Sequence, residues 1–241
     1  VPRGAGLISP PGSPLLAARS LSWRFAAFEV PFEAVEAAGA EIRASGDEVY
    51  LGGLVSGLRL YHRRLDRPVE AIPIAVPIMV RSSESPYQTR MSIGRLAGPT
   101  GIDDPFERVL TVREQIRAAR NEPAVNAFND VGPMLAWLPG QIVGQFSGAT
   151  TQNDLQASNV GGIDWESYVA GARVERMFAF GPLPGCAMMA TMVTYNGTSC
   201  IGINYDAAAV TEQELFAESI VDGFNEVLAL ADPSGRMIRF T

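Results

Sequence analysis

Lysine is absent from this sequence, in which all 19 basic residues are arginine. The absence excludes a Schiff-base lysine and the lysine of a P-loop. Histidine occurs once and cysteine twice, as Cys186 and Cys200. These are too few ligands for a His/Cys zinc cluster and too few bridges for a disulfide scaffold. We therefore expect no metal site and no resident cofactor, and the two thiols fit packing roles in a reducing compartment.

Long apolar runs and basic clusters are missing as well. No stretch of 18 or more apolar residues occurs, so no transmembrane helix is predicted. The 26 acidic residues outnumber the 19 basic ones and give a net charge of −7, which makes nucleic acid a poor partner. Hydrophobic residues make up 47% of the 241 residues, which excludes a disordered chain. We expect a globular cytoplasmic protein.

The order of the predicted elements defines the fold class. A stretch rich in glycine, proline and serine predicts a linker over 1–20, followed by one domain over 21–241. Strands are expected at 22–30, 71–80, 155–160, 174–180 and on both sides of Asn196-Gly197; helices are expected at 31–44, after 45–47, from 103, in pieces within 124–148, and at 211–230. This mixed order predicts an α/β fold, a two-layer sandwich with helices packed on a mixed sheet.

Two strand signals are local. Asn196-Gly197 lies between two β-rich runs and predicts a hairpin with a type I′ turn, because that turn needs positive φ at both central residues. The run at 71–80 is almost wholly apolar, which is typical of a strand covered on both faces. Its prolines, Pro73 and Pro77, predict an edge position or a bulge.

The helices carry three further signals. Gly52, Gly53 and Gly57 each cost up to about 1 kcal/mol relative to alanine, so a close backbone approach is expected to compensate. Thr211 and Glu214 predict a capping box at the start of the last helix. The inner face of the helix that begins near 103 is expected to consist of Phe106, Val109, Leu110 and Ile116.

The single histidine lies in a His-x-x-x-Asp spacing formed by His62 and Asp66. This spacing is the core of the general-base motif of coenzyme A-dependent acyltransferases, in which the imidazole deprotonates a hydroxyl. The motif ends in glycine, whereas Arg67 stands here, and charged residues surround His62 at a helix end. We interpret His62 as a surface histidine favoured by the helix dipole, and so as a decoy.

Two clusters are candidates for a site. Ser158 and Asn159 end a buried strand just before Gly161, and polar groups in an apolar setting need hydrogen-bond partners. A ligand could supply one, and an ordinary strand-end turn is the other interpretation. Asp47 and Glu48 open a helix, where acidic residues stabilise the N-terminal dipole.

Four segments of the sequence resemble the C-terminal half of bacterial wax ester synthase/diacylglycerol acyltransferases, and together they cover nearly the whole chain. The most specific parts are the Asn-Gly-Thr hairpin that contains Asn196 and Gly197 and the Ser-Asn-Val-x-Gly segment. The four segments are 13–39, 47–62 with 76–82, 95–120, and 153–163 with 181–210.

The resemblance implies one half of a chloramphenicol acetyltransferase-like fold, with the active site in a tunnel between two similar halves. It implies transfer of a fatty acyl group from acyl-coenzyme A to diacylglycerol or a fatty alcohol, without a metal. The base motif, His-His-x-x-x-Asp-Gly, belongs to the N-terminal half, which this sequence does not contain. Ser158, Asn159 and Gly161 would then line the tunnel, and no catalytic residue is expected in this chain.

The partners follow from the same resemblance. They are an N-terminal acyltransferase half, acyl-coenzyme A and a lipid acceptor, with peripheral contact to the inner membrane or lipid inclusions. An apolar face that the other half covers would favour self-association of the isolated chain.

The sequence departs from the family pattern at two places, and two alternative functions remain open. Family members carry Asn-Asp where this chain has Asp47-Glu48, and proline where Gly161 stands. Either change could mark a divergent member, so one rival is a non-catalytic binding or scaffold module with the same fold. The other rival is an acyltransferase that is self-sufficient through His62.

Overall fold

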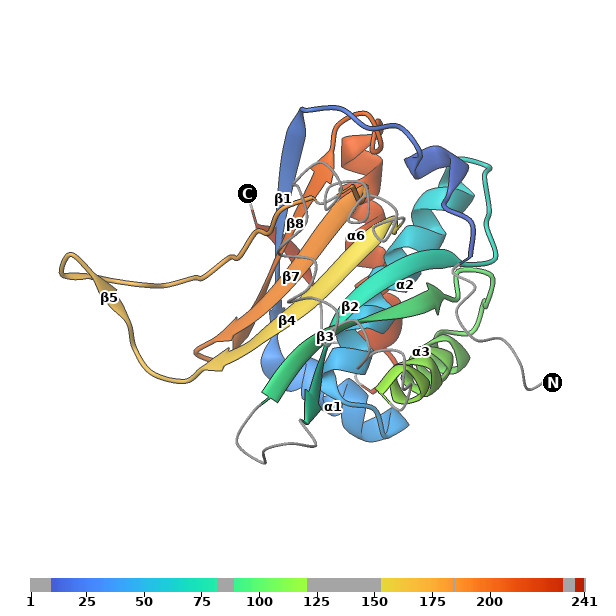
Figure 1. Cartoon of the computed structure of the whole chain (residues 1–241). Helices are drawn as coiled ribbons and strands as arrows, with labels where there is room; N and C mark the ends of the chain where they lie inside the picture. Colours follow the sequence, from blue (N-terminus) through green and yellow to red (C-terminus); the bar gives the residue numbers. More distant parts are fainter. Residues whose placement is uncertain (1–9, 82–88, 121–152, 184, 232–236, 241) are drawn as a thin grey trace, which may run out of the picture.

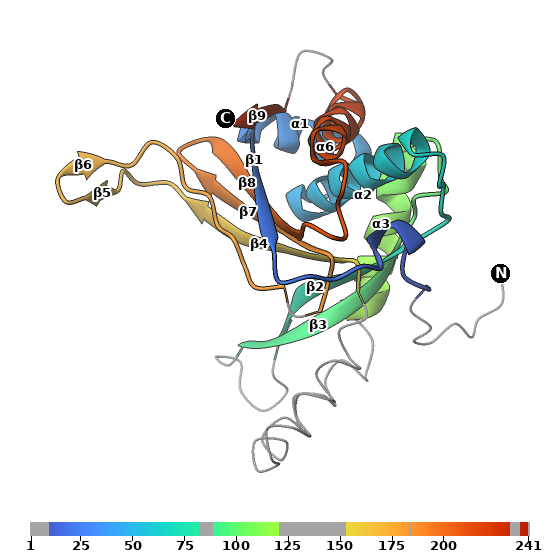
Figure 2. The same ribbon diagram turned by 90° about the horizontal axis from the view of Figure 1, so that it is seen from above.

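The computed structural model describes residues 10–81, 89–120, 153–183, 185–231 and 237–240. They form a mixed β-sheet with helices packed against one face (Figures 1 and 2). The expected two-layer α/β sandwich is thereby confirmed. The helical pieces expected within 124–148 lie outside the described residues.

The main sheet has seven strands in the order β3-β2-β4-β7-β8-β1-β9. β4 pairs in parallel with both of its neighbours, β2 and β7, and the other pairs are antiparallel. β2 pairs only with the first two residues of β4, so the end of β4 is flanked by β7 alone. The strands are β1 (Trp23–Pro31), β2 (Ile72–Arg81), β3 (Thr89–Gly98), β4 (Leu155–Ile163), β7 (Met188–Tyr195), β8 (Thr198–Asp206) and β9 (Ile238–Phe240).

The helix layer consists of α1 (Phe32–Ile42), α2 (Gly46–Arg64), α3 (Pro105–Arg120) and α6 (Gln213–Leu228). α2 packs between α3 and α6 (Figure 2). A Cβ added at Gly53 would lie 2.6 Å from the ring of Phe224, and one at Gly57 would lie 2.8 Å from the Cα of Ile220. The expected close backbone approach is confirmed at Gly57, and it explains the glycine there. At Gly52 and Gly53 the space is filled by the side chains of Val109 and Phe224 instead.

The predicted hairpin is confirmed. Asn196 and Gly197 have φ values of 45° and 76°, as a type I′ turn requires. They join β7 to β8, and Tyr195 pairs with Thr198. Because the turn supplies both positive φ values, the two strands continue in register to Met188 and Tyr205.

The expectation that Pro73 and Pro77 mark an edge strand or a bulge is wrong. β2 lies between β3 and β4, and its register with β3 is unbroken. Pro73 is opposite Ala97, whose backbone N–H and C=O both bond to the side chain of Gln115 instead of β2. Each proline nitrogen therefore faces away from β3, and β4 pairs with only two residues of β2, so no ladder hydrogen bond is lost.

The strand expected at 174–180 is wrong. This segment is irregular, and the hairpin of β5 (Tyr168–Val169) and β6 (Ala172–Arg173) precedes it, projecting from the body as an arm (Figure 1). Residues 174–183 then cross the sheet face opposite the helices. There the Arg176 Nε donates to Glu29 Oε1 at 2.6 Å, and the Asn204 amide donates to the carbonyl of Gly181 at 2.7 Å. The segment crosses strands that already have partners, so it forms no ladder.

The prediction of a linker over 1–20 is wrong for part of the residues that the structure describes. Pro14–Leu16 form a 3₁₀ turn, the side chain of Ser13 caps it, and Leu16 is fully buried. The packed body therefore begins at Ser13, upstream of the boundary expected at residue 21. The apolar Leu16 anchors a stretch whose composition alone is typical of a linker.

The capping box expected from Thr211 and Glu214 is absent. α6 begins at Gln213, and its N-cap, Glu212, makes no side-chain capping hydrogen bond. The apolar spacing of the helix nevertheless decides which of its faces is buried, although Leu215 on that face is only half-buried. Phe216, Ile220, Phe224, Val227 and Leu228 are all buried.

The inner face of α3 is only partly as expected. Val109 and Ile116 are buried, but Phe106 is 42% exposed and Leu110 is half-buried. Arg108 takes an inner position and is fully buried. Its guanidinium donates to backbone carbonyls at the start of α3, to a serine hydroxyl on α2 and to a glutamate on α6. These bonds satisfy a charge that would otherwise be costly to bury.

Candidate functional site

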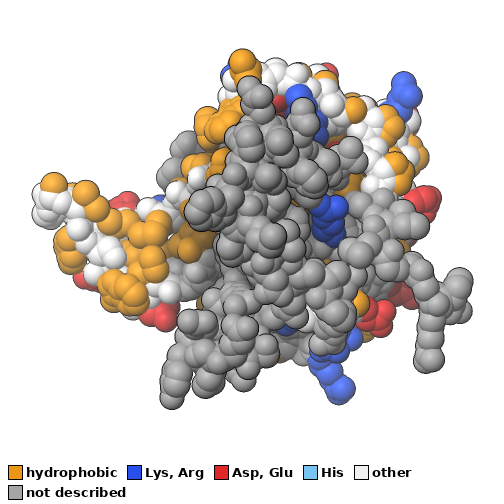
Figure 3. Space-filling view, viewed as in Figure 1, with side chains coloured by type: hydrophobic (Ala, Val, Ile, Leu, Met, Phe, Trp, Pro, Cys, Tyr) orange, Lys and Arg blue, Asp and Glu red, His pale blue; other side chains and the backbone are white. Residues whose placement is uncertain are grey.

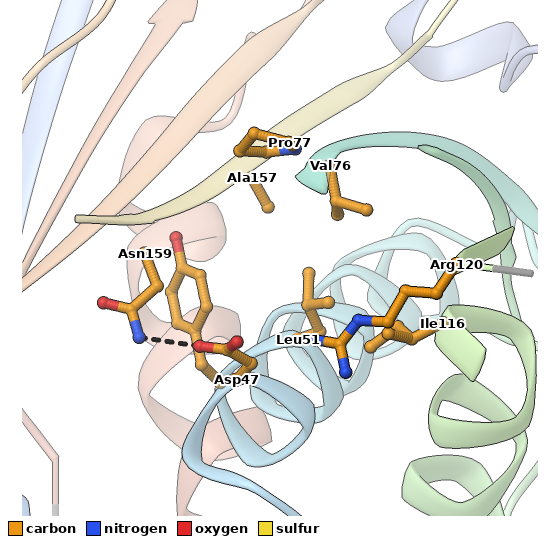
Figure 4. A pocket seen from close by; sticks show the side chains of 9 residues that line it. Asp47, Leu51, Val76, Pro77, Ile116, Arg120, Ala157 and Asn159 are labelled. Carbon is orange, nitrogen blue, oxygen red and sulfur yellow. Dashed lines mark hydrogen bonds between the residues drawn. The ribbon is translucent and has the colours of Figure 1, made fainter. Parts of the chain in front are cut away.

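A cavity of about 60 Å³ lies between the sheet and the helices, near the first turn of α2 (Figure 4). β2 and β4 form one wall, and α2 and the C-terminal end of α3 form the other (Figure 4). Both charged and apolar side chains meet there. The lining residues are Asp47, Tyr50, Leu51, Val76, Pro77, Ile116, Arg120, Ala157 and Asn159.

Asp47 and Asn159 form the polar edge of the cavity. The Asn159 amide nitrogen donates to the Asp47 carboxylate at 2.7 Å, and the Asn159 amide oxygen accepts from the backbone N–H of Gly161 at 3.0 Å (Figure 4). The register of β4 shifts between Asn159 and Gly161, and Gly161 has φ of 101°. Proline, locked near −65°, could not adopt this φ, so glycine allows a bulge that proline would forbid.

Glu48 has a different role from its neighbour Asp47. Ser45 caps α2 by accepting from the Glu48 backbone N–H, while the Glu48 carboxylate accepts from the Ser45 N–H at 2.8 Å. This is a complete capping box. Glu48 is therefore used in starting the helix, and Asp47, one position earlier, is left to reach across to β4.

Tyr50 is a site residue that the sequence analysis missed. It is 2% exposed, and its hydroxyl has no hydrogen-bond partner among the described residues. The hydroxyl lies close to the backbone of Ser158 but without hydrogen-bond geometry. Burial raises the pKa of Tyr50 well above its ordinary value, and the charge of Asp47 adds to the effect. The sequence feature that could have pointed to Tyr50 is its i, i+3 spacing from Asp47, which puts both residues on one helix face.

Ser158 and Asn159 project from opposite faces of the sheet, because successive strand residues alternate. Leu155 and Ala157 belong to the core beneath the helices, and Asn159 continues that face. Ser158 lies on the other face, beside Thr191 of β7. The two residues predicted together as tunnel-lining therefore do not share one wall of the cavity.

His62 is not a surface histidine, and that expectation is wrong. It is 1% exposed, its Nε2 is 2.6 Å from the Ser13 hydroxyl, and its Nδ1 is 2.7 Å from the carbonyl of Leu58. Burial lowers its pKa. Ser13 also donates its backbone N–H to Asp154 at 2.6 Å. With both ring nitrogens engaged inside the body, His62 ties the N-terminal turn to α2.

The described residues contain no group of three or more histidine, cysteine, aspartate or glutamate side chains that could hold a metal ion. Within the same residues, no helix has the length and apolarity needed to cross a membrane. Cys186 and Cys200 are buried, and burial raises the pKa of the Cys186 thiol to about 11. Neither thiol is poised as a nucleophile.

The sheet, its helix layer and the cavity define a two-layer α/β protein, and comparisons with known proteins specify its family. The family model described as the WS/DGAT C-terminal domain matches residues 91–227. A Mycobacterium tuberculosis protein provisionally named diacylglycerol O-acyltransferase is 36% identical over 228 residues, which are 94% of this chain and 46% of that protein. The chain belongs to the wax ester synthase/diacylglycerol acyltransferase family.

Solved structures agree on the fold. The wax ester synthase/diacylglycerol acyltransferase from Marinobacter aquaeolei VT8 matches with a TM-score of 0.69 and 18% identity, covering 92% of this chain and 52% of that one. A solved structure that describes condensation domain-mediated chain release from the enacyloxin polyketide synthase also matches. Its TM-score is 0.59 and its identity 13%, and the match covers 95% of this chain and 46% of that one. The chain therefore spans about half the length of the relatives that it matches.

Proposed function

We propose that this chain is the C-terminal half of a long-chain O-acyltransferase. The whole protein would move a fatty acyl group from acyl-coenzyme A to diacylglycerol or a fatty alcohol. The observation that carries the proposal is the match to the C-terminal domain of the family at about half the length of the relatives. The buried, doubly bonded His62 supports it, because among the described residues this chain offers no accessible imidazole base.

The division of labour follows from this chemistry. An alcohol attacks a thioester when a base takes its proton, and that help is worth roughly 10²–10⁴-fold. We propose that the base comes from the other half of the protein, while this half binds and orients substrate. The acyl donor is a substrate, and no resident cofactor is part of the proposal.

The arm, together with Trp165 just before it, offers the surface that the proposed partner half would contact. Trp165, Tyr168 and Val169 are 67%, 59% and 68% exposed, and hydrophobic side chains gather over this projection (Figure 3). Apolar surface of this kind marks interaction sites. We propose that the other half covers the arm, and that the whole protein works at a membrane or lipid-inclusion surface, where its acceptors reside.

The test compares four proteins with palmitoyl-coenzyme A and a diacylglycerol: this chain alone, this chain with His62→Ala, the whole protein, and the whole protein with His62→Ala. We expect transfer only by the two whole proteins, with equal turnover per folded molecule. Transfer by the chain alone that His62→Ala abolishes would show a self-sufficient enzyme instead. A whole protein that binds palmitoyl-coenzyme A but never transfers the acyl group would be a binding module.

A further inference from the structure

Tyr50 is the feature of the cavity that the fold leaves unexplained. A buried hydroxyl without a partner is destabilising, and such groups are rare in folded proteins. Nothing among the described residues gives this hydroxyl a hydrogen bond, yet the residue lines a cavity and its hydroxyl senses the charge of Asp47, which lines the same cavity. The burial that raises its pKa keeps the hydroxyl protonated. It is therefore a hydrogen-bond donor in need of an acceptor.

The other groups that line the cavity limit which hydrogen-bond acceptors can bind beside the Tyr50 hydroxyl. Arg120 contributes a second set of donors from the end of α3, and one oxygen of Asp47 is already bonded to Asn159 (Figure 4). Among the described lining residues, one carboxylate and one guanidinium give no net charge, which does not favour the phosphates of coenzyme A. Leu51, Val76 and Ile116 supply apolar walls. A neutral group with an acceptor oxygen and methylene neighbours fits this set.

We propose that the cavity binds an ester group of a glyceride acceptor, whose carbonyl oxygen accepts a hydrogen bond from Tyr50. About 60 Å³ holds the few heavy atoms of an ester, since one water needs roughly 10–15 Å³ on this measure. This inference rests on the proposed function and deepens it. Tyr50 favours a diacylglycerol over a simple fatty alcohol, because only the glyceride carries esters beside its free hydroxyl.

The reacting hydroxyl of the glyceride is then outside the cavity and free to meet the base of the other half. Tyr50 takes no part in the proton transfer and acts as a specificity-determining residue. Its removal should weaken binding of the glyceride and leave a simple alcohol unaffected.

Kinetics of the whole protein test this with palmitoyl-coenzyme A as donor and two acceptors, 1,2-dihexanoylglycerol and 1-hexadecanol. We expect Tyr50→Phe to raise the KM for the glyceride roughly tenfold, as loss of one hydrogen bond does, without changing the KM for hexadecanol. Its melting temperature should stay the same or rise, because an unpartnered hydroxyl is removed. Equal changes in both KM values, no change in either, or a lower melting temperature would overturn the proposal.

Tyr61→Phe is the matched control on the same helix. Tyr61 is equally buried, but it does not line the cavity. This variant should therefore keep both KM values.

Binding of 1,2-dihexanoyloxypropane, a diester with no hydroxyl, separates this inference from the proposed function. Calorimetry should give a dissociation constant roughly tenfold higher for Tyr50→Phe than for the unaltered protein, even if the protein transfers no acyl group. Equal constants overturn the ester site, whereas absent transfer overturns only the proposed activity.

Discussion

The carboxylate of Asp47 accepts a hydrogen bond from the amide of Asn159 across 112 residues of sequence, at 2.7 Å. The bond joins the first turn of α2 to the bulge in β4, and it therefore fixes the polar edge of the cavity. Each partner has a second constraint. Asp47 is placed by the capping box of α2, and Asn159 bonds to the backbone of Gly161.

A double-mutant cycle should measure this link. Asp47→Ala and Asn159→Ala each remove it, so the double variant should lose less stability than the two single losses added together. The coupling should be about 0.5–1 kcal/mol, because both side chains are partly in solvent. Urea unfolding of the three variants measures it, and strict additivity would show that the bond does not form in solution.

Replacement of Gly57 by alanine should damage the helix layer. The added Cβ would lie 2.8 Å from the Cα of Ile220, and overpacking of this kind costs about 1–3 kcal/mol. Gly46→Ala is the matched control on α2, because its Cβ would meet Val35 at an ordinary 3.8 Å. Thermal unfolding should show a lower midpoint for the first variant and no loss for the second. Equal midpoints would contradict the close packing of α2 and α6.

The arm should promote self-association of the isolated chain. Trp165→Ser with Val169→Ser should shift the average mass in sedimentation toward the 25.8 kDa of one chain, because exposed apolar area drives association. The melting temperature should be unchanged, since both side chains are exposed. Leu21→Ser, at a fully exposed apolar position outside the arm, is the control and should leave the mass as it was. An unaltered chain that is monomeric at every concentration would refute the expectation.

Sequence signals that act over a few residues predicted the fold well. The turn at Asn196-Gly197 and the helix start marked by Asp47 and Glu48 depend on backbone geometry that neighbouring residues determine. Segment 174–180 has strand-like composition, but it crosses strands that already have partners, so tertiary context overrides its propensity. Thr211 and Glu214 have the spacing of a capping box, yet the helix begins at Gln213, too late to use it.

The candidate site was predicted in parts. Asp47 and Asn159 were named separately, because each stands at the end of an element, but nothing in the sequence shows that they meet. Tyr50 was not among the predicted site residues, because the absence of a partner for its hydroxyl exists only in three dimensions. His62 was read from its charged neighbours as exposed, whereas Ser13, 49 residues earlier, covers it.

Asp154 should give the protein an unusual pH dependence. It is 3% exposed, and burial raises its pKa from 3.8 to about 6, against the opposing hydrogen bond from the Ser13 backbone and the charge of Arg19. At pH values between these two pKa values, the folded state therefore still binds a proton that the unfolded state has released. Stability from this group is full below the unfolded pKa and is lost as the pH rises from about 4 to 6. The loss is of order 3 kcal/mol, at 1.36 kcal/mol per pKa unit.

Asp154→Asn should remove this dependence while its amide oxygen still accepts from Ser13. The free energy of unfolding of the variant, minus that of the unaltered protein, should be larger at about pH 8 than at about pH 4. His62 gives the free energy of unfolding the opposite pH dependence, because its lowered pKa costs stability as the pH falls below its ordinary value of 6.5. Taking the difference between the variant and the unaltered protein cancels this contribution. It also cancels any constant cost of the new amide.

Asp206→Asn is the control with the opposite sign. Burial raises the pKa of Asp206, but hydrogen bonds from Ser20 and from the Ala208 backbone outweigh it and leave the pKa below its ordinary value of 3.8. Its stabilisation is present above that value and is lost only as the pH falls through the folded pKa. Denaturant unfolding from about pH 3 to pH 8 should therefore place the effect of Asp206→Asn at the acidic end and that of Asp154→Asn between about pH 4 and 6. A flat difference for Asp154→Asn across that window would mean that its carboxyl group is hydrated in solution, and that the N-terminal turn does not bury it.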